Sequence, residues 1–159
     1  MSAIGFGQHD HAHCITDTLR TAEVHCREHK LQFTPVRRRV LELLLQQHRA
    51  LGAYDILPQL AAEGLGSQPP VAYRALDFLV RNGLAHRIER LNAYAACAHL
   101  GRAHAPAFLI CRDCHQIAEA DGEQANSALR QAAEASGFVI ERIAIEVEGL
   151  CPACHEVQS

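Results

Sequence analysis

The sequence reads ICRDC at residues 110–114 and LCPAC at residues 150–154, and these two stretches decide how its C-terminal part folds. In each stretch two residues separate two cysteines, a spacing that lets one turn present both thiolates to a single tetrahedral ion. Together the pairs supply a complete four-cysteine zinc site, made by Cys111, Cys114, Cys151 and Cys154. We therefore expect a structural zinc ion that ties the start of a C-terminal subdomain to its end, so that metal binding contributes to folding.

Two disulfides or a pair of redox dithiols would use the same cysteines, and CPAC is similar to the turn of a thioredoxin-type active site. Such an enzyme needs one dithiol at a helix start, whereas this chain has two matched pairs. No apolar run approaches the roughly 18 residues of a membrane span, and the N-terminus lacks a basic segment followed by a hydrophobic one. We therefore expect a cytoplasmic protein, whose thiols stay reduced and available to metal.

The charge of the chain is distributed unevenly. Residues 1–90 carry eleven Lys/Arg against nine Asp/Glu, and residues 91–159 carry four against nine. Within residues 27–49 six basic side chains stand against two acidic ones, so the first half can face a polyanion and the second cannot. Eleven histidines beside a single methionine and no tryptophan point towards metals.

The first half has the pattern of a helical domain. A stripe from Cys14 to His29 contains Ile15, Leu19, Ala22 and Cys26 at helical spacing. Thr34-Pro35 is typical of a helix start, and Val36, Val40, Leu43 and Leu44 follow it, leaving Arg37, Arg38 and Arg39 mainly towards solvent. Residues 53–62 predict a short helix in which Pro58 causes a bend or a late start.

A third helix is predicted to open after residues 67–70 and to stop at Asn82-Gly83. Two short strand-like runs follow it, at about 84–89 and 93–97. Three helices and a hairpin in this order predict a winged helix-turn-helix, whose third helix enters the DNA major groove. On that helix Arg74 can bind a guanine edge or a phosphate, and Tyr73 can pack on the backbone. A salt bridge from Arg74 to Asp77 or Glu63 is the structural alternative.

The second half predicts an α/β subdomain. Residues 106–111 and 116–120 have the character of strands on either side of the first cysteine pair, and residues 122–136 that of a helix. Residues 138–148 alternate, which predicts a strand with one apolar face made by Val139, Ile143, Ile145 and Val147. A piece this small needs its zinc site and a partner subunit to persist.

Five further donors lie around the junction of the two halves: His86, Cys97, His99, His104 and Glu119. They form no tight local motif, and each one taken singly is more typical of a surface or packing residue. At the N-terminus His9, His11 and His13 alternate before Cys14, which is compatible with a transient metal site but more typical of a solvated tail.

The sequence resembles the ferric uptake regulator family, and most closely its zinc uptake regulator branch. The resemblance rests on residues 34–37, 53–55, 69–79 and 83–86 and on the two cysteine pairs, and it covers about residues 15–155. It implies an α+β protein: an N-terminal winged helix-turn-helix and a C-terminal α/β dimerisation domain with the four-cysteine zinc site. We accordingly expect a His-rich flexible tail at 1–13, a DNA-binding domain at 14–96, a hinge at 97–105 and a dimerisation and zinc domain at 106–159.

The resemblance also implies the function. It is that of a homodimeric repressor, not an enzyme, which binds double-stranded operator DNA when loaded with zinc and represses zinc-uptake genes. Matched to the branch, the sensory ligands are His86, Cys97, His104 and Glu119, with His99 as a spare donor. Each chain would thus hold one structural and one regulatory Zn²⁺. The implied DNA contacts are Tyr54 and Arg74, beside the Tyr73 named above, while Val71-Ala72 replaces the family's usual threonine-valine pair.

Other functions are compatible with parts of this pattern. A different metal or a peroxide could be the signal in the same family, although the soft sulfur of Cys97 selects against iron and manganese. A thiol oxidoreductase would use CPAC but would leave the winged helix without a role. A zinc deaminase is excluded because its His-x-Glu motif and the proline before its cysteine pair are absent.

Overall fold

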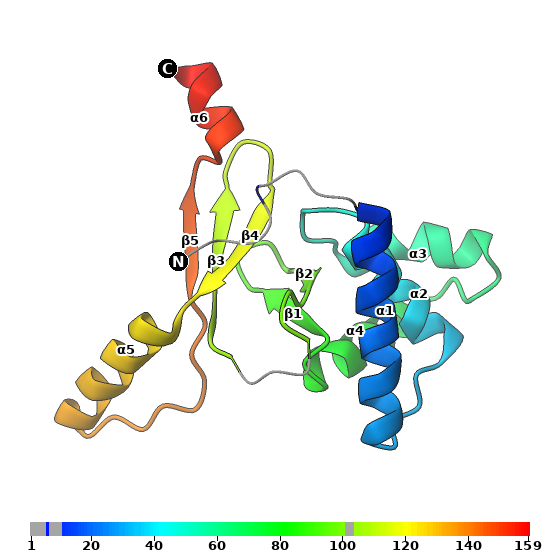
Figure 1. Ribbon diagram of the computed structural model, residues 1–159, viewed down its shortest axis with the longest axis horizontal. Coiled ribbons are helices and arrows are strands. Elements are labelled where there is room, and N and C mark those ends of the chain that lie inside the picture. The colour runs from blue at the N-terminus through cyan, green and yellow to red at the C-terminus, as the bar shows by residue number, and fades with distance from the viewer. Residues whose placement is uncertain (1–5, 7–10, 101–103) are drawn as a thin grey trace. The chain divides into compact units, whose positions relative to one another are not determined.

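Four helices and a small hairpin form the first of two units into which the chain divides, Gln8–Arg102, and a three-stranded sheet forms the second, which includes Ala103–Ser159 (Figure 1). The computed structural model describes Phe6, residues 11–100 and residues 104–159. Among the described residues, no helix is both long and apolar enough to span a membrane.

Helix α1 (His11–Glu28) confirms the first helical stripe. Leu19, Ala22 and Cys26 are buried on one side of it, and Ile15 packs against the same core. Burial raises the pKa of the Cys26 thiol, which makes this cysteine a small core side chain and not a reactive group. The helix begins at His11, so residues 11–13, which we had expected in the flexible tail, are helical. Apart from Phe6, the rest of that tail (1–10) lies outside the described residues.

Helix α2 (Pro35–Leu45) starts where its capping signal predicted. The backbone N–H of Arg37 donates to the Thr34 hydroxyl, and Pro35 occupies the first helical position, where its missing N–H costs nothing. Its apolar face is buried in the core of the unit and consists of Val40, Leu41, Leu43 and Leu44.

Helices α3 (Ala53–Ala62) and α4 (Pro69–Arg81) form the predicted helix-turn-helix. The Asp55 carboxylate accepts the Gly52 N–H at 2.8 Å and fixes the start of α3, so the late start that we considered at Pro58 is wrong. The intervening turn bends at Gly64 and Gly66, both at positive φ. A Cβ on Gly66 would lie 2.9 Å from Val71 Cγ1, so the turn packs tightly against α4. The buried face of α4 is Ala72, Ala75, Leu76 and Leu79, as its period predicted.

Strands β1 (Ala85–Ile88) and β2 (Ala93–Ala96) pair antiparallel and form the wing. Their turn contains Asn92 at positive φ, a conformation that asparagine tolerates better than most residues. The wing is attached to the helical core through an isolated bridge in which Leu51 and Tyr94 exchange backbone hydrogen bonds of 2.8 and 2.9 Å.

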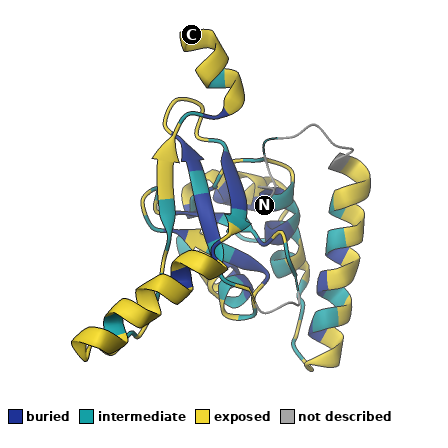
Figure 2. Ribbon diagram, turned by 60° about the vertical axis from the view of Figure 1, so that its left-hand side comes forward, coloured by how far each residue is buried: buried dark blue, intermediate teal, exposed yellow. Residues whose placement is uncertain are grey.

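The second unit is a sheet of order β4-β3-β5 with helix α5 and a short C-terminal helix (Figure 1). Strand β3 (Pro106–Cys111) pairs antiparallel with β4 (Ile117–Asp121) and parallel with β5 (Glu146–Gly149). Helix α5 (Glu123–Ser136) ends on Gly137 in the left-handed region, and α6 (Pro152–Gln158) ends the chain. Burial is concentrated on β3 and β4, while α5 is exposed along most of its length (Figure 2).

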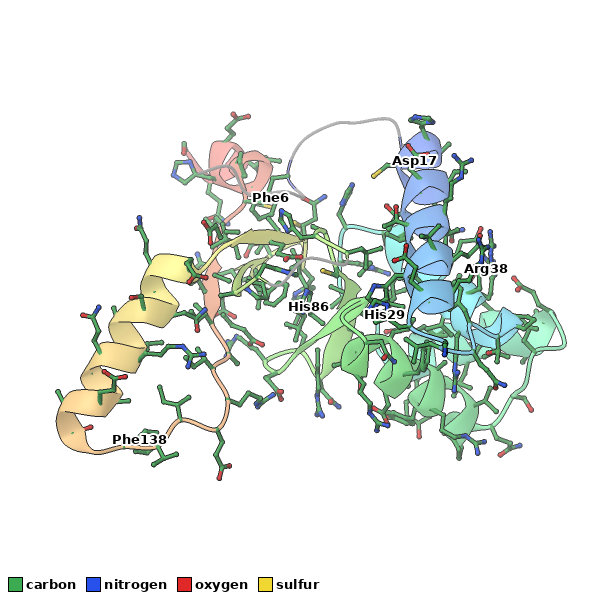
Figure 3. The ribbon with its side chains drawn as sticks, turned by 60° about the horizontal axis from the view of Figure 1, so that its bottom comes forward. Phe6, Asp17, His29, Arg38, His86 and Phe138 are labelled. Atoms are coloured by element: carbon green, nitrogen blue, oxygen red, sulfur yellow. The ribbon has the colours of Figure 1, made fainter. Side chains whose placement is uncertain are left out.

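The long strand predicted for residues 138–148 is wrong over most of its length. Only residues 146–149 form a strand, and Phe138 and Val139 are 68% and 82% exposed (Figure 3). Alternation describes which side chains share a face, but a strand also needs a neighbour to take its backbone hydrogen bonds. Among the described residues, β3 is the neighbour of this segment, and their pairing begins at Phe108 and Glu146.

Candidate metal centres and DNA-facing helix

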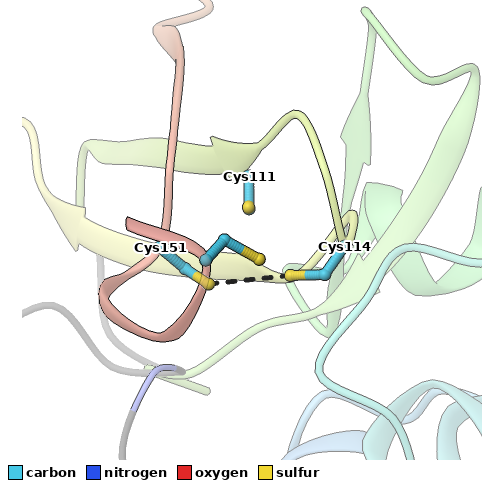
Figure 4. Close-up of side chains that lie close together, drawn as sticks. Cys111, Cys114 and Cys151 are labelled. Carbon is cyan, nitrogen blue, oxygen red and sulfur yellow. Dashed lines mark hydrogen bonds between the residues drawn. The ribbon is translucent and has the colours of Figure 1, made fainter. Parts of the chain in front are cut away.

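The four cysteines of the two CxxC stretches converge on one point in the second unit. Cys111 ends β3, Cys114 lies in the turn that follows, and Cys151 and Cys154 belong to the start of α6 (Figure 4). Their four sulfur atoms all lie within 4.8 Å of one another, and those of Cys114 and Cys151 are 3.7 Å apart. Sulfurs placed tetrahedrally at about 2.3 Å from zinc are separated by about 3.8 Å. The cluster therefore has the size of a structural zinc site.

The two turns that carry these sulfurs are closed by the same kind of backbone hydrogen bond. The N–H of His115 donates to the Cys111 carbonyl, and the N–H of His155 donates to the Cys151 carbonyl. Sequence reasoning missed α6, although Cys151-Pro152 has the same form as the Thr34-Pro35 start: a cap residue with a proline directly after it. The far end of α6 is tied back to the first turn, because the Gln158 amide donates to Asp113.

The thiol groups of the cluster have pKa values shifted in opposite directions. Hydrogen bonds from the backbone N–H groups of Cys114 and Cys151 lower the pKa of Cys111 to about 6. Its hydrogen bond with the Cys151 sulfur, together with burial, raises the pKa of Cys154 to about 12. Without a cation one sulfur ionises readily while another keeps its proton. A divalent ion would stabilise all four as thiolates, so the donor set fits zinc.

Within the first unit, His86 and Cys97 lie on one face of the wing. His86 is paired with Ala95, and the Cys97 N–H donates to the Leu84 carbonyl at 3.0 Å, so Cys97 lies two residues beyond the partner of His86. Side chains in this diagonal relation are about 7–8 Å apart at Cα and point to the same side. Cys97 is 2% exposed, and its sulfur accepts the His99 N–H at 3.3 Å. From the sequence His99 was expected only as a spare metal ligand, and the hydrogen bond from its backbone N–H was not predicted.

Within the second unit, His104 and Glu119 form a second pair. His104 Nε2 lies 2.8 Å from a carboxylate oxygen of Glu119, which is 5% exposed on β4. A buried carboxylate needs a partner, and here an imidazole supplies it. At this separation both ligand atoms could bind one divalent ion. The four predicted sensory ligands are thus two local pairs, one in each unit.

The N-terminal donors are described only in part. His13 Nε2 lies 3.2 Å from the Asp17 carboxylate one helical turn on, and both side chains are largely exposed. Cys14 is also exposed, whereas His9 and the side chain of His11 lie outside the described residues.

The predicted DNA contacts lie on the exposed sides of α3 and α4. Tyr54 is 70% exposed and Tyr73 is 38% exposed. Arg74 is exposed and donates to the Pro70 carbonyl at 3.3 Å. The predicted structural alternatives for Arg74 are wrong, because it forms no ion pair with any described residue and Glu63 binds Arg39 instead. The Arg74 head group is therefore available to a ligand.

The arginine run of α2 is not the open basic surface that its composition suggested. Arg37 stacks 3.8 Å above the centre of the Phe78 ring, and Arg38 pairs with Glu23 at 2.8 Å. Arg39 pairs with both Glu42 and Glu63. The prediction that these three side chains mainly face solvent is therefore corrected: only Arg38 is exposed, and all three contribute to packing or internal charge pairing.

Comparison with known proteins gives a consistent result. Residues 28–148 match the ferric uptake regulator family. The chain is 35% identical over 144 residues to the zinc uptake regulation protein of Escherichia coli (strain K12), covering 90% of this chain and 84% of that protein. The corresponding protein of Shigella flexneri matches equally well.

Two solved structures are similar as well. One is a zinc uptake regulator complexed with zinc and DNA, with a TM-score of 0.86 and 35% identity, over 91% of this chain and 97% of that one. The other is holo XcZur, with a TM-score of 0.80 and 37% identity, over 88% of this chain and 98% of that one.

Proposed function

Because the chain belongs to the ferric uptake regulator family, we propose that it is a zinc-responsive transcriptional repressor, which binds operator DNA as a zinc-loaded homodimer and represses genes for zinc uptake. The observation that carries the proposal is its 35% identity, over nine-tenths of its length, to a zinc uptake regulation protein. The same proposal makes it a regulator and not an enzyme, acting in the cytoplasm, where its DNA is found.

The proposed structural zinc ion is held by Cys111, Cys114, Cys151 and Cys154. Sulfur separations of the right size and an equivalent backbone hydrogen bond in both pairs support this assignment. Its role is to stabilise the second unit, the proposed dimerisation domain. Zinc supplies there the positive charge that four neighbouring thiolates require.

The proposed sensory zinc ion is held by His86, Cys97, His104 and Glu119. One thiolate and one carboxylate neutralise a divalent ion, and the two imidazoles complete a tetrahedral set. Its support is local: in the first unit His86 and Cys97 lie on one face of the wing, and in the second unit His104 Nε2 lies 2.8 Å from a Glu119 carboxylate oxygen. Residues 97–105 are the proposed hinge between domains at 14–96 and 106–159.

This division of ligands suggests how zinc controls DNA binding. An ion shared by both domains would limit the angle between them, and hence the distance between the two reading helices of a dimer. Zinc would favour the DNA-competent form only by the difference between its affinities for the two forms, typically about 1–3 kcal/mol. By the same linkage, operator DNA should tighten zinc binding by an equal factor.

On each reading head, Tyr54, Tyr73 and Arg74 are the proposed DNA contacts. Their exposure and the freedom of the Arg74 head group from ion pairs support the proposal. At position 71 the family's usual threonine would offer a hydroxyl to a phosphate. Val71 has no hydroxyl, and its side chain lies against Gly66.

The direct test is zinc per chain on the purified protein, before and after mild chelation, with DNA binding measured at each step. Two ions that fall to one, with DNA binding lost at the same step and recovered on adding zinc, are the expected result. A single ion that never leaves, with DNA binding unaffected by added zinc, would contradict the zinc sensor.

A further inference from the structure

The exposed face of α4 carries an acidic side chain as well as the basic one already assigned. Asp77 and Arg74 are three residues apart, so they lie on neighbouring turns of the same side of the helix, opposite the buried Ala72 and Leu76. Both are exposed. Tyr73 directly precedes Arg74 and lies four positions before Asp77, so it flanks Asp77 on this face and is also partly exposed.

Asp77 differs from most acidic residues of its unit in having no ionic partner. Glu23, Glu42 and Glu63 each pair with an arginine, and Asp55 caps α3. Across the described residues Asp77 forms no ion pair, even with Arg74. Its recorded interaction is electrostatic: the pKa of Tyr94 is raised chiefly by burial, and the charge of Asp77 adds to this while Arg87 opposes it.

A carboxylate on a surface that approaches DNA is repelled by every phosphate, so it weakens binding to all sequences alike. A contact that offsets this repulsion must go to a base. In the major groove an aspartate accepts a hydrogen bond from the N4 amino group of cytosine. Phosphate oxygens are acceptors, so they cannot donate such a bond to the carboxylate. The side chain then favours one base pair while it disfavours non-specific binding.

The spacing on the helix suits this role. Three residues of an α-helix advance about 4.5 Å along its axis, and neighbouring base pairs are about 3.4 Å apart. An arginine and an aspartate separated by one such step can therefore address adjacent base pairs from one helix. We propose that Asp77 is a specificity-determining residue that reads a cytosine in the operator, beside the base pair contacted by Arg74. This inference rests on the proposed function as a DNA-binding repressor.

The test is a selection from a pool of randomised DNA duplexes with the zinc-loaded dimer of the wild type, Asp77→Asn and Glu28→Gln. Glu28 is the exposed last residue of α1, outside the helix-turn-helix, so Glu28→Gln removes the same charge from the same unit. We expect wild type and Glu28→Gln to select the same sequence. Asp77→Asn should lose the preference for C·G at one position in each half-site and keep the others.

A quantitative measurement follows on the selected operator. Replacing that C·G pair by T·A should weaken wild-type binding roughly tenfold and weaken binding of Asp77→Asn by less than about twofold. Because of the lost repulsion, Asp77→Asn should also bind random duplexes more tightly than the wild type. Equal losses for both proteins at every position would overturn the proposal.

Two other outcomes have distinct meanings. If wild-type protein selects no sequence with or without zinc, the proposed function itself fails, and the role of Asp77 fails with it. If Asp77→Asn and a second variant, Asp77→Ser, lower the melting temperature but select the wild-type sequence, Asp77 supports Tyr94 and the wing and does not read DNA.

Discussion

Arg39 on α2 holds Glu63, the residue after α3, with two parallel hydrogen bonds, from Nε at 2.8 Å and from Nη2 at 2.7 Å. Paired hydrogen bonds of this kind fix the orientation of both side chains, so the pair ties α2 to the end of the first helix of the helix-turn-helix. The same contact leaves Arg74 without an ionic partner among the described residues.

Glu63→Gln should make the stability of the DNA-binding unit depend less on pH. Hydrogen bonds from Arg39 hold the pKa of Glu63 below its ordinary value. A carboxyl whose pKa is lower when folded stabilises the protein above its unfolded pKa of about 4.3, and this contribution is lost as the pH falls through the folded value. The melting temperature of the variant should therefore be lower than that of the wild type at pH 7, and the two should approach each other below about pH 4. Glu28→Gln is the control, and a gap that persists in acid would contradict the assignment.

Gly66→Ala should destabilise the protein more than Gly64→Ala. Both glycines have positive φ, which costs a residue with a Cβ about 1–2 kcal/mol. Only at Gly66 does the added Cβ also meet Val71, at 2.9 Å, whereas nothing lies within 4 Å at Gly64. Urea unfolding of the two variants measures the difference. Equal losses would mean that the turn does not pack on α4 as described.

Cys114→Ser should remove the structural zinc and loosen the second unit. A serine hydroxyl is a poor zinc ligand at neutral pH, so the variant should lose the zinc ion. The three remaining thiolates then have no counter-ion. We expect one zinc fewer per chain and faster amide hydrogen exchange in β3, β5 and α6. Cys14→Ser, at an exposed cysteine outside the cluster, is the matched control. Wild-type zinc content in Cys114→Ser would exclude the four-cysteine site.

Cys97→Ser should keep the fold and lose the response to zinc. The sulfur of Cys97 is the only soft ligand in the proposed sensory set, so its loss should release the exchangeable ion and keep the tight one. Without that ion, DNA binding should lose its zinc dependence, a change of roughly 5- to 150-fold for the usual coupling energies. Fluorescence anisotropy with labelled operator, with and without zinc, measures this. Zinc-dependent binding that survives in the variant would exclude Cys97 as a ligand.

Arg74→Ala should weaken binding to the selected operator by about 1–3 kcal/mol, whereas Arg20→Ala should have little effect. Arg20 is also exposed but lies on α1, outside the helix-turn-helix. If Arg74 contacts a base, Arg74→Ala should lose the preference for one base pair at one position of the operator. If it contacts a phosphate, affinity falls for all sequences, and the salt dependence of binding decreases by about one charge.

Features encoded by neighbouring residues could be predicted from the sequence. The Thr34 cap, the stop of α4 at Asn82-Gly83 and the cysteine turns each depend on a few adjacent positions, and all are found as predicted. The predicted strand at 138–148 failed because a strand depends on a neighbour, and the chain supplies one only from residue 146 onwards. The charge pairing of Arg39 was missed for a similar reason, because Glu63 is 24 residues away.

In the candidate metal sites, too, what depends on neighbouring residues was predictable from the sequence and what depends on distant residues was not. Spacing alone identified the four-cysteine cluster, because each pair is a local turn. His86, Cys97, His104 and Glu119 have no such spacing, and they were singled out only through the family resemblance. The structure adds two local contacts that the sequence does not reveal, from the His99 N–H to the Cys97 sulfur and between His104 and Glu119.

The contrast between the two cysteines of α1 has a practical consequence for measuring domain motion. Cys14 is exposed at one end of the helix, and Cys26, twelve residues further on, is buried. When zinc occupies the proposed sites, the remaining sulfurs are bound to metal, so a maleimide dye should attach to Cys14 alone. A dimer labelled in this way would carry one fluorophore on each reading head without any engineered cysteine. Energy transfer between the two dyes would then report the distance between the heads as zinc is added or removed.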